Sequence, residues 1–145
     1  MNRRILMATL FLASTLAHPA LSAEDEKKKD GKVDAGQYVE LQPVGLPIVA
    51  GGRLVNYVFV YVRINLTSSA NASRLREKEP FFRDAMVRAA HRTPFTLASD
   101  LGKIDEARLI ASVTRDAIAI SGPGQIKSVI LTSQAPRRRM IKAPA

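Results

Sequence analysis

The stretch Arg53-Leu-Val-Asn-Tyr-Val-Phe-Val-Tyr-Val-Arg-Ile-Asn-Leu66 is the longest run of β-branched and aromatic residues in the chain, and it predicts one long strand. Side chains alternate between the two faces of a strand, so the aliphatic and aromatic members separate. One face carries Leu54, Val58, Val60, Val62, Ile64 and Leu66, and the other carries Val55, Tyr57, Phe59, Tyr61 and Arg63. The aliphatic face suits a covering layer of helices, whereas the aromatic face suits a second layer or a partner. Because such rings are more often buried, we expect them to be covered within the domain.

Length, charge and composition narrow the class of protein. The 145 residues are enough for one modest domain with a single core. The absence of cysteine excludes disulfide frameworks, thiolate metal sites and cysteine nucleophiles. A net charge of +9 would usually suggest a nucleic-acid or anionic-membrane partner, but the runs of basic residues lie in the terminal segments: Arg3-Arg4, Lys27 to Lys29 among acidic residues, and Arg137 to Arg139. Since no basic stripe interleaved with aromatic residues lies between them, we predict no nucleic-acid partner.

Composition divides the chain into four segments. Residues 1–23 combine two arginines, an apolar run and small residues before Glu24, which is typical of a secretory signal peptide, with a short inner-membrane anchor as the alternative. Residues 24–36 are mostly charged and predict a flexible spacer. Residues 37–134 are expected to form one domain, and residues 135–145 a basic, disordered tail. The sequence thus predicts an exported protein of a bacterial periplasm.

Two short strands are expected before the long one, over residues 37–41 and 46–50. The pair Gly51-Gly52 predicts a hairpin between the second short strand and the long strand, because glycine adopts positive φ freely. A last strand is expected over residues 125–134, with Ile126 and Ile130 on one face and Val129 and Leu131 on the other.

Helical periodicity lies between these strands. A first helix is expected between Asn71 and Thr93, and Pro80 either kinks this helix or begins a second one. Its apolar stripe comprises Leu75, Phe81, Phe82, Ala85, Met86, Ala89 and Ala90. A further helix is expected from an N-cap at Ser99-Asp100 to about Ile120, before Gly122-Pro-Gly124. The predicted fold class is α+β, a mainly antiparallel sheet in the order β-β-β-α-α-β with two helices on one face.

The sequence contains none of the catalytic motifs considered. His91 is the one histidine left after signal-peptide removal, and a histidine at a helix end is a common structural feature. The chain has no Gly-x-Ser-x-Gly elbow and no closely spaced pair of carboxylates after a strand. We therefore predict no enzyme activity and no catalytic, cofactor-binding or metal-binding residues. A small periplasmic hydrolase that uses His91 is the alternative of a different class.

The segment Pro80-Phe-Phe-Arg-Asp-Ala85 resembles the FliL family of flagellar basal-body-associated proteins. Its setting is also similar: a long strand precedes it, Phe95-Thr-Leu-Ala-Ser-Asp-Leu-Gly102 resembles the family's linker between helices, and a closing strand covers Ile126 to Leu131. The resemblance spans about residues 38–134. The chain departs from the family in its short hydrophobic segment with a plausible cleavage site and in its basic tail.

The resemblance implies a stomatin-like α+β fold and a non-enzymatic accessory role in the flagellar motor and motility. It also implies homo-oligomers and contacts with stator proteins. The candidate interface comprises Tyr57, Phe59, Tyr61, Arg83 and Asp84. A cation such as Arg83 near a helix start is unfavourable to the helix dipole, which favours a carboxylate partner across an interface; a local ion pair is the alternative. An envelope binding protein unrelated to motility is a further alternative.

Overall fold

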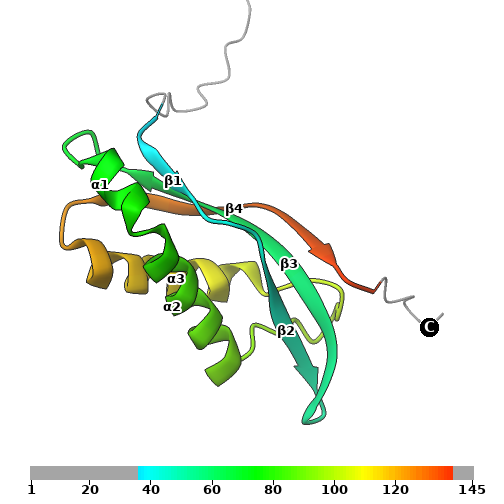
Figure 1. Ribbon diagram of the computed structural model, residues 1–145. Coiled ribbons are helices and arrows are strands. Elements are labelled where there is room, and N and C mark those ends of the chain that lie inside the picture. The colour runs from blue at the N-terminus through cyan, green and yellow to red at the C-terminus, as the bar shows by residue number, and fades with distance from the viewer. Residues whose placement is uncertain (1–35, 139–145) are drawn as a thin grey trace, which may run out of the picture. The chain divides into compact units, whose positions relative to one another are not determined.

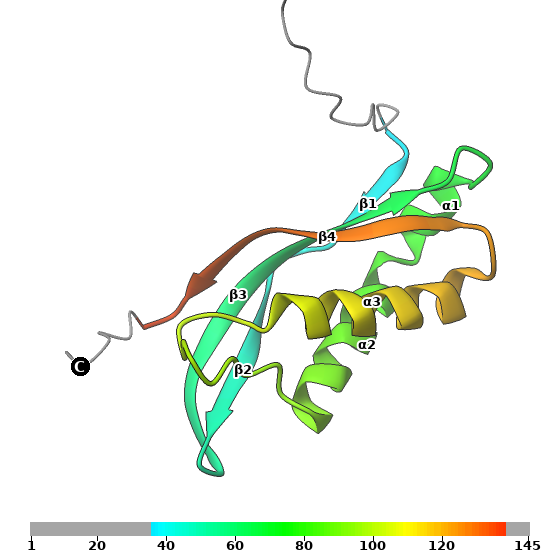
Figure 2. The same cartoon turned by 180° about the vertical axis from the view of Figure 1, so that it is seen from behind.

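The computed structural model describes residues 36–138, so the predictions for residues 1–35 and 139–145 lie outside the described residues. The elements are β1 (Tyr38–Glu40), β2 (Val44–Ala50), β3 (Arg53–Leu66), α1 (Ala72–Glu77), α2 (Glu79–Arg92), α3 (Glu106–Ser121) and β4 (Ile126–Pro136). The helices lie on one side of a four-stranded antiparallel sheet (Figures 1 and 2). The predicted α+β class is confirmed, with three helices in place of two.

Strand β3 confirms the long strand predicted over residues 53–66, and it is the centre of the sheet. Strands β1 and β2 pair with its two ends, at 63–65 and 53–60, and β4 pairs with residues 58–66. Because these pairings overlap, β1 and β2 follow one edge of β3 and β4 follows the other. The Gly51-Gly52 hairpin is confirmed: both glycines have positive φ, 58° and 72°, which a type I′ turn requires.

The inner face of the sheet, defined here as the face beneath the helices, forms the core. Val58, Val60, Val62 and Ile64 of β3 are all at most 2% exposed. They pack with Phe82 and Met86 of α2, Leu109 of α3 and the loop residue Ile104, all of which are buried. Burial of each such side chain contributes about 1.5–3 kcal/mol, so this layer provides most of the hydrophobic stabilisation.

Leu54 is an exception to the predicted alternation, with 53% of its surface exposed. Ile48 pairs with Asn56 but Val49 pairs with Leu54, so Val55 forms a β-bulge. One extra residue reverses the side-chain alternation beyond it, which turns Leu54 away from the inner face.

Strand β4 contains two bulges, and they correct the predicted faces. Its pairing with β3 omits Lys127 and Thr132. As a result Ile126 pairs with Leu66 on the inner face, whereas Ile130 pairs with Arg63 on the opposite face. The expectation that Ile126 and Ile130 share a face is therefore wrong.

The predicted start of the tail at Ala135 is also wrong. Ala135 and Pro136 continue β4 opposite Phe59 and Val58, and the Arg137 amide donates to the Tyr57 carbonyl at 2.8 Å. Asn56 extends this connection. Its side chain accepts from the Arg138 amide and donates to the carbonyls of Arg138 and Leu101, so a buried amide anchors the end of β4.

Pro80 begins a helix rather than kinking one. Helix α1 ends at Glu77, and Pro80 occupies the first turn of α2, where its missing N–H costs no hydrogen bond. Phe81, expected in the apolar stripe, is 63% exposed, because the buried stripe follows Phe82, Met86, Ala89 and Ala90.

Helix α3 begins later than predicted. Its N-cap is Asp105, whose carboxylate accepts from the Arg108 amide at 3.2 Å. Asp100 instead accepts from the Gly102 amide, which forms a local turn in the loop. The predicted stop at Gly122 is confirmed, since this C-cap residue has a φ of 91°.

Candidate functional site

The outer face of the sheet, opposite the helices, carries exposed apolar side chains. Phe59 and Tyr61 of β3 and Ile130 of β4 are 43%, 41% and 39% exposed, and Tyr57 is half-buried. We call these four residues the outer-face cluster. No element among residues 36–138 covers them, as the two opposite views show (Figures 1 and 2). The expectation that the aromatic rings are covered within the domain is therefore wrong.

The ring of Phe59 lies along the sheet. Gly45 of β2 pairs with Phe59, and a Cβ atom at this glycine would approach the ring edge to 3.4 Å. The ring therefore occupies the space that a glycine side chain leaves open, an arrangement that protects the backbone and flattens the surface. A glycine in a strand opposite an aromatic residue is the sequence signal that could have predicted this packing.

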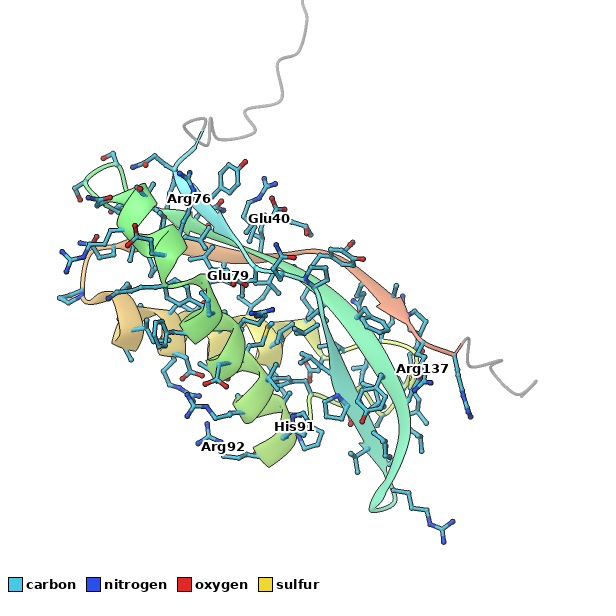
Figure 3. All side chains as sticks on the ribbon, in the orientation of Figure 1. Glu40, Arg76, Glu79, His91, Arg92 and Arg137 are labelled. Atoms are coloured by element: carbon cyan, nitrogen blue, oxygen red, sulfur yellow. The ribbon has the colours of Figure 1, made fainter. Side chains whose placement is uncertain are left out.

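Charged residues border the outer-face cluster near β1. The Arg63 guanidinium carbon lies 4.4 Å from the centroid of the Tyr38 ring, and its Nη2 lies 3.4 Å from Glu40 Oε1. Arg76 of α1 donates from Nε to the Tyr38 carbonyl oxygen at 3.2 Å and lies in the same region as Glu40 (Figure 3). The outer face thus has an apolar centre with a polar border, which is the usual organisation of a protein–protein interface.

Arg83 and Asp84 do not join this surface. They belong to α2, on the helical side of the sheet, so the structure separates them from Tyr57, Phe59 and Tyr61. Arg83 Nε lies 3.6 Å from Glu79 Oε1, and Asp84 Oδ2 lies 2.9 Å from Arg88 Nη2, each one helical turn away. Arg83 therefore has a carboxylate partner in its own helix, so no partner across an interface is needed to explain a cation at this position.

Glu79, labelled in Figure 3, explains why a cation is favourable at this position. Its Oε1 also accepts from the Gln42 amide at 2.9 Å, which links the start of α2 to the segment between β1 and β2. Arg83 balances the charge of this carboxylate, so its role is local.

A second surface feature lies between α2 and α3, and sequence reasoning missed it. An open cavity of about 770 Å³ is lined by Arg92, Arg108, Arg115, Asp116, Ser112 and Phe95, together with small residues of both helices. The two helices follow one another in the chain and run roughly antiparallel, so that the start of α2 lies near the end of α3, where Lys78 Nζ donates to the Ile120 carbonyl at 3.2 Å. The signal available in the sequence was a pair of arginines one turn apart in the first helix, Arg88 and Arg92, and a pair two turns apart in the second, Arg108 and Arg115. The two helix faces that carry these pairs come together only in the folded structure.

His91, the candidate base of the hydrolase alternative, is exposed on the last turn of α2 (Figure 3). Its Nδ1 lies 2.8 Å from the Val87 carbonyl oxygen, so that nitrogen serves as a donor within the helix. His91 does not line the cavity between α2 and α3. Within residues 36–138, no group of three or more histidine, cysteine, aspartate or glutamate side chains is placed to hold a metal ion.

None of the helices within the described range is long and apolar enough to span a membrane. The predicted signal peptide or anchor over residues 1–23 lies outside that range.

Comparison with known proteins gives no assignment: no protein-family model matches the chain, and no curated protein matches it.

Proposed function

We propose that this protein is a non-enzymatic periplasmic binding protein, similar to the FliL family, that self-associates through the outer-face cluster and supports the flagellar motor. In this proposal the occupant of the outer face is a second copy of the chain, and stator proteins contact the resulting assembly. The fold would correspond to the stomatin-like domain that the sequence resemblance implies.

The observation that carries the proposal is the exposure of Phe59, Tyr61 and Ile130 on a face that no element within residues 36–138 covers. Aromatic residues are enriched in interfaces because they bury a large area with little loss of side-chain entropy. The flat packing of Phe59 over Gly45 and the charged border at Arg63 and Glu40 add the shape and the polar rim that an interface needs.

The position of His91 supports a binding protein over a hydrolase. A catalytic base is expected to face a pocket that also holds a nucleophile within hydrogen-bond reach. The His91 ring contacts the backbone of its own helix, and the cavity between α2 and α3 is lined by arginines and small residues without His91.

Self-association can be tested with a matched pair of variants. Phe59→Ser and Phe81→Ser each remove an exposed phenylalanine, the first from the outer face and the second from α2. We expect Phe59→Ser to lower the oligomer fraction in analytical ultracentrifugation, and Phe81→Ser to leave it at the wild-type level. A monomeric wild-type protein at all accessible concentrations, or equal effects of both variants, would refute the proposed interface.

The motor role needs a cellular test. Deletion of the gene, and its replacement with the Phe59→Ser allele, should both reduce spreading in soft agar, whereas the Phe81→Ser allele should restore it. Normal swimming of the deletion strain would remove the motor role. The ultracentrifugation result would then stand by itself as evidence for an envelope binding protein.

A further inference from the structure

The groove between α2 and α3 extends beyond its main cavity. A smaller hollow of about 260 Å³ adjoins it and shares Arg92 and Asp116, with Arg88 and Ile120 on its walls. Along α3 the two hollows reach from Arg108 to Ile120, which at 1.5 Å per residue is about 18 Å. A surface of that length accommodates about five residues of an extended chain.

Positive charge dominates the walls of this groove. Arg88, Arg92, Arg108 and Arg115 line the two hollows, and Asp116 is the one carboxylate in either lining. Arg115 is engaged by that carboxylate, at 3.1 Å from Nε to Oδ1, and by the Ser112 hydroxyl at 3.4 Å. Arg88 pairs with Asp84 on the outside of α2.

Arg92 and Arg108 differ from the other two arginines. Neither has a carboxylate at ion-pair distance within the described part of the chain. Arg108 lies over the buried Phe95 ring, with 5.9 Å between the guanidinium carbon and the ring centroid. Arg92 extends from the last turn of α2 away from the sheet (Figure 3). Two guanidinium groups on opposite walls are thus available to an anionic ligand.

Small side chains separate these walls. Ala85 and Ala89 of α2 and Ala111 and Ala119 of α3 line the hollows. A peptide backbone can approach such residues closely, while its side chains reach the arginines on either wall.

We propose that the groove between α2 and α3 binds an extended acidic peptide segment of a partner protein, with carboxylates of the peptide pairing with Arg92 and Arg108. Charge complementarity and the length of the groove carry the inference. A single inorganic anion would contact one part of a groove of this length. An anionic membrane would meet a flat surface more readily than a concave one. This site is independent of the outer-face cluster, which lies on the opposite side of the sheet.

The test uses the purified protein and a fluorescein-labelled peptide of alternating glutamate and alanine, with fluorescence anisotropy as the readout. A matched peptide with glutamine in place of glutamate shows whether the carboxylates are needed. The groove variant is Arg92→Gln with Arg108→Gln. Its control is Arg53→Gln with Arg137→Gln, which removes the same charge from exposed positions outside the groove.

We expect saturable binding of the glutamate peptide, none of the glutamine peptide, and a loss of affinity of about tenfold in the groove variant, as for two exposed charge pairs. The control variant should lose about twofold or less, because only long-range attraction changes. Thermal melts of both variants should match the wild type.

Three results would overturn the proposal. The first is an absence of saturable peptide binding. The second is an equal loss of affinity in the groove and control variants, which would indicate non-specific attraction to a basic protein. The third is a direct titration in which inorganic phosphate, or vesicles of phosphatidylglycerol, bind with an affinity that the groove variant lowers while the glutamate peptide does not bind; that outcome would assign a small-anion or membrane site.

Discussion

The two faces of β3 both carry large hydrophobic side chains but have opposite environments. The inner-face residues Val58, Val60, Val62 and Ile64 are almost completely buried. Phe59 and Tyr61, which alternate with them and face outward, are more than 40% exposed. The inner face is covered by helices of the same chain, and the outer face by nothing within residues 36–138. In the proposed function, one strand therefore supplies the folding core with one face and the surface for self-association with the other.

The largest effect is expected for Val60→Asp. This side chain is 1% exposed at the centre of the inner face, and an unpaired carboxylate there costs several kcal/mol, comparable with the whole stability of a small domain. Circular dichroism should show an unfolded or partly folded protein at 25 °C. A cooperative melt close to that of the wild type would contradict the assignment of this face as the core.

A smaller but clear loss is expected for Asn56→Ala. Asn56 is 4% exposed, and its side chain bonds to the backbone of Leu101 and Arg138. Removal leaves part-buried backbone groups of Leu101 and Arg138 without this partner, which costs about 2 kcal/mol in the free energy of unfolding by urea. A loss below about half a kcal/mol would mean that the end of β4 is held by other contacts.

Tyr61→Ala should separate stability from association. Because 41% of this residue is exposed, truncation should cost less than about 1.5 kcal/mol in thermal unfolding of the monomer, yet weaken self-association. If Tyr61→Ala destabilises the domain as strongly as Val60→Asp, the outer face is core and cannot be a docking surface.

The smallest effect is expected for Arg83→Glu. Arg83 pairs within α2 with Glu79, and such a pair one turn apart contributes only a few tenths of a kcal/mol. The melting temperature and the oligomeric state should both stay near the wild-type values. A specific loss of self-association in this variant would return Arg83 to the interface.

Local sequence patterns were sufficient to predict the main elements of the fold. Period-two alternation separated the faces of β3, and Gly51-Gly52 fixed the hairpin because positive φ is nearly a glycine property. Phe82 and Met86 were placed in the core by helical periodicity. These features depend on residues close together in sequence, so they can be predicted from the sequence alone.

Features that depend on pairing between distant residues were not predicted. The bulges at Val55, Lys127 and Thr132 are defined only by the register with a partner strand. They place Leu54 and Ile130 on the opposite face from the one that simple alternation predicts. The choice of Asp105 over Asp100 as N-cap follows from how the loop packs, since Ile104 between them is buried. The arginine groove needs two helices brought together, and the exposure of Phe59 depends on the absence of a second layer in the described domain.

The proposed self-association through the outer face of β3 has a direct spectroscopic test. The chain has three tyrosines, and Tyr38, Tyr57 and Tyr61 all lie on the outer-face side of their strands, opposite Asn65 or on β3 itself. Fluorine NMR of protein labelled with 3-fluorotyrosine therefore reports on this face alone. We expect the Tyr57 and Tyr61 resonances to shift or broaden as concentration rises, whereas the Phe82 and Phe95 resonances of fluorophenylalanine-labelled protein stay fixed. Tyrosine resonances independent of concentration, together with a moving Phe81 resonance, would contradict the proposal by placing association on the helical side.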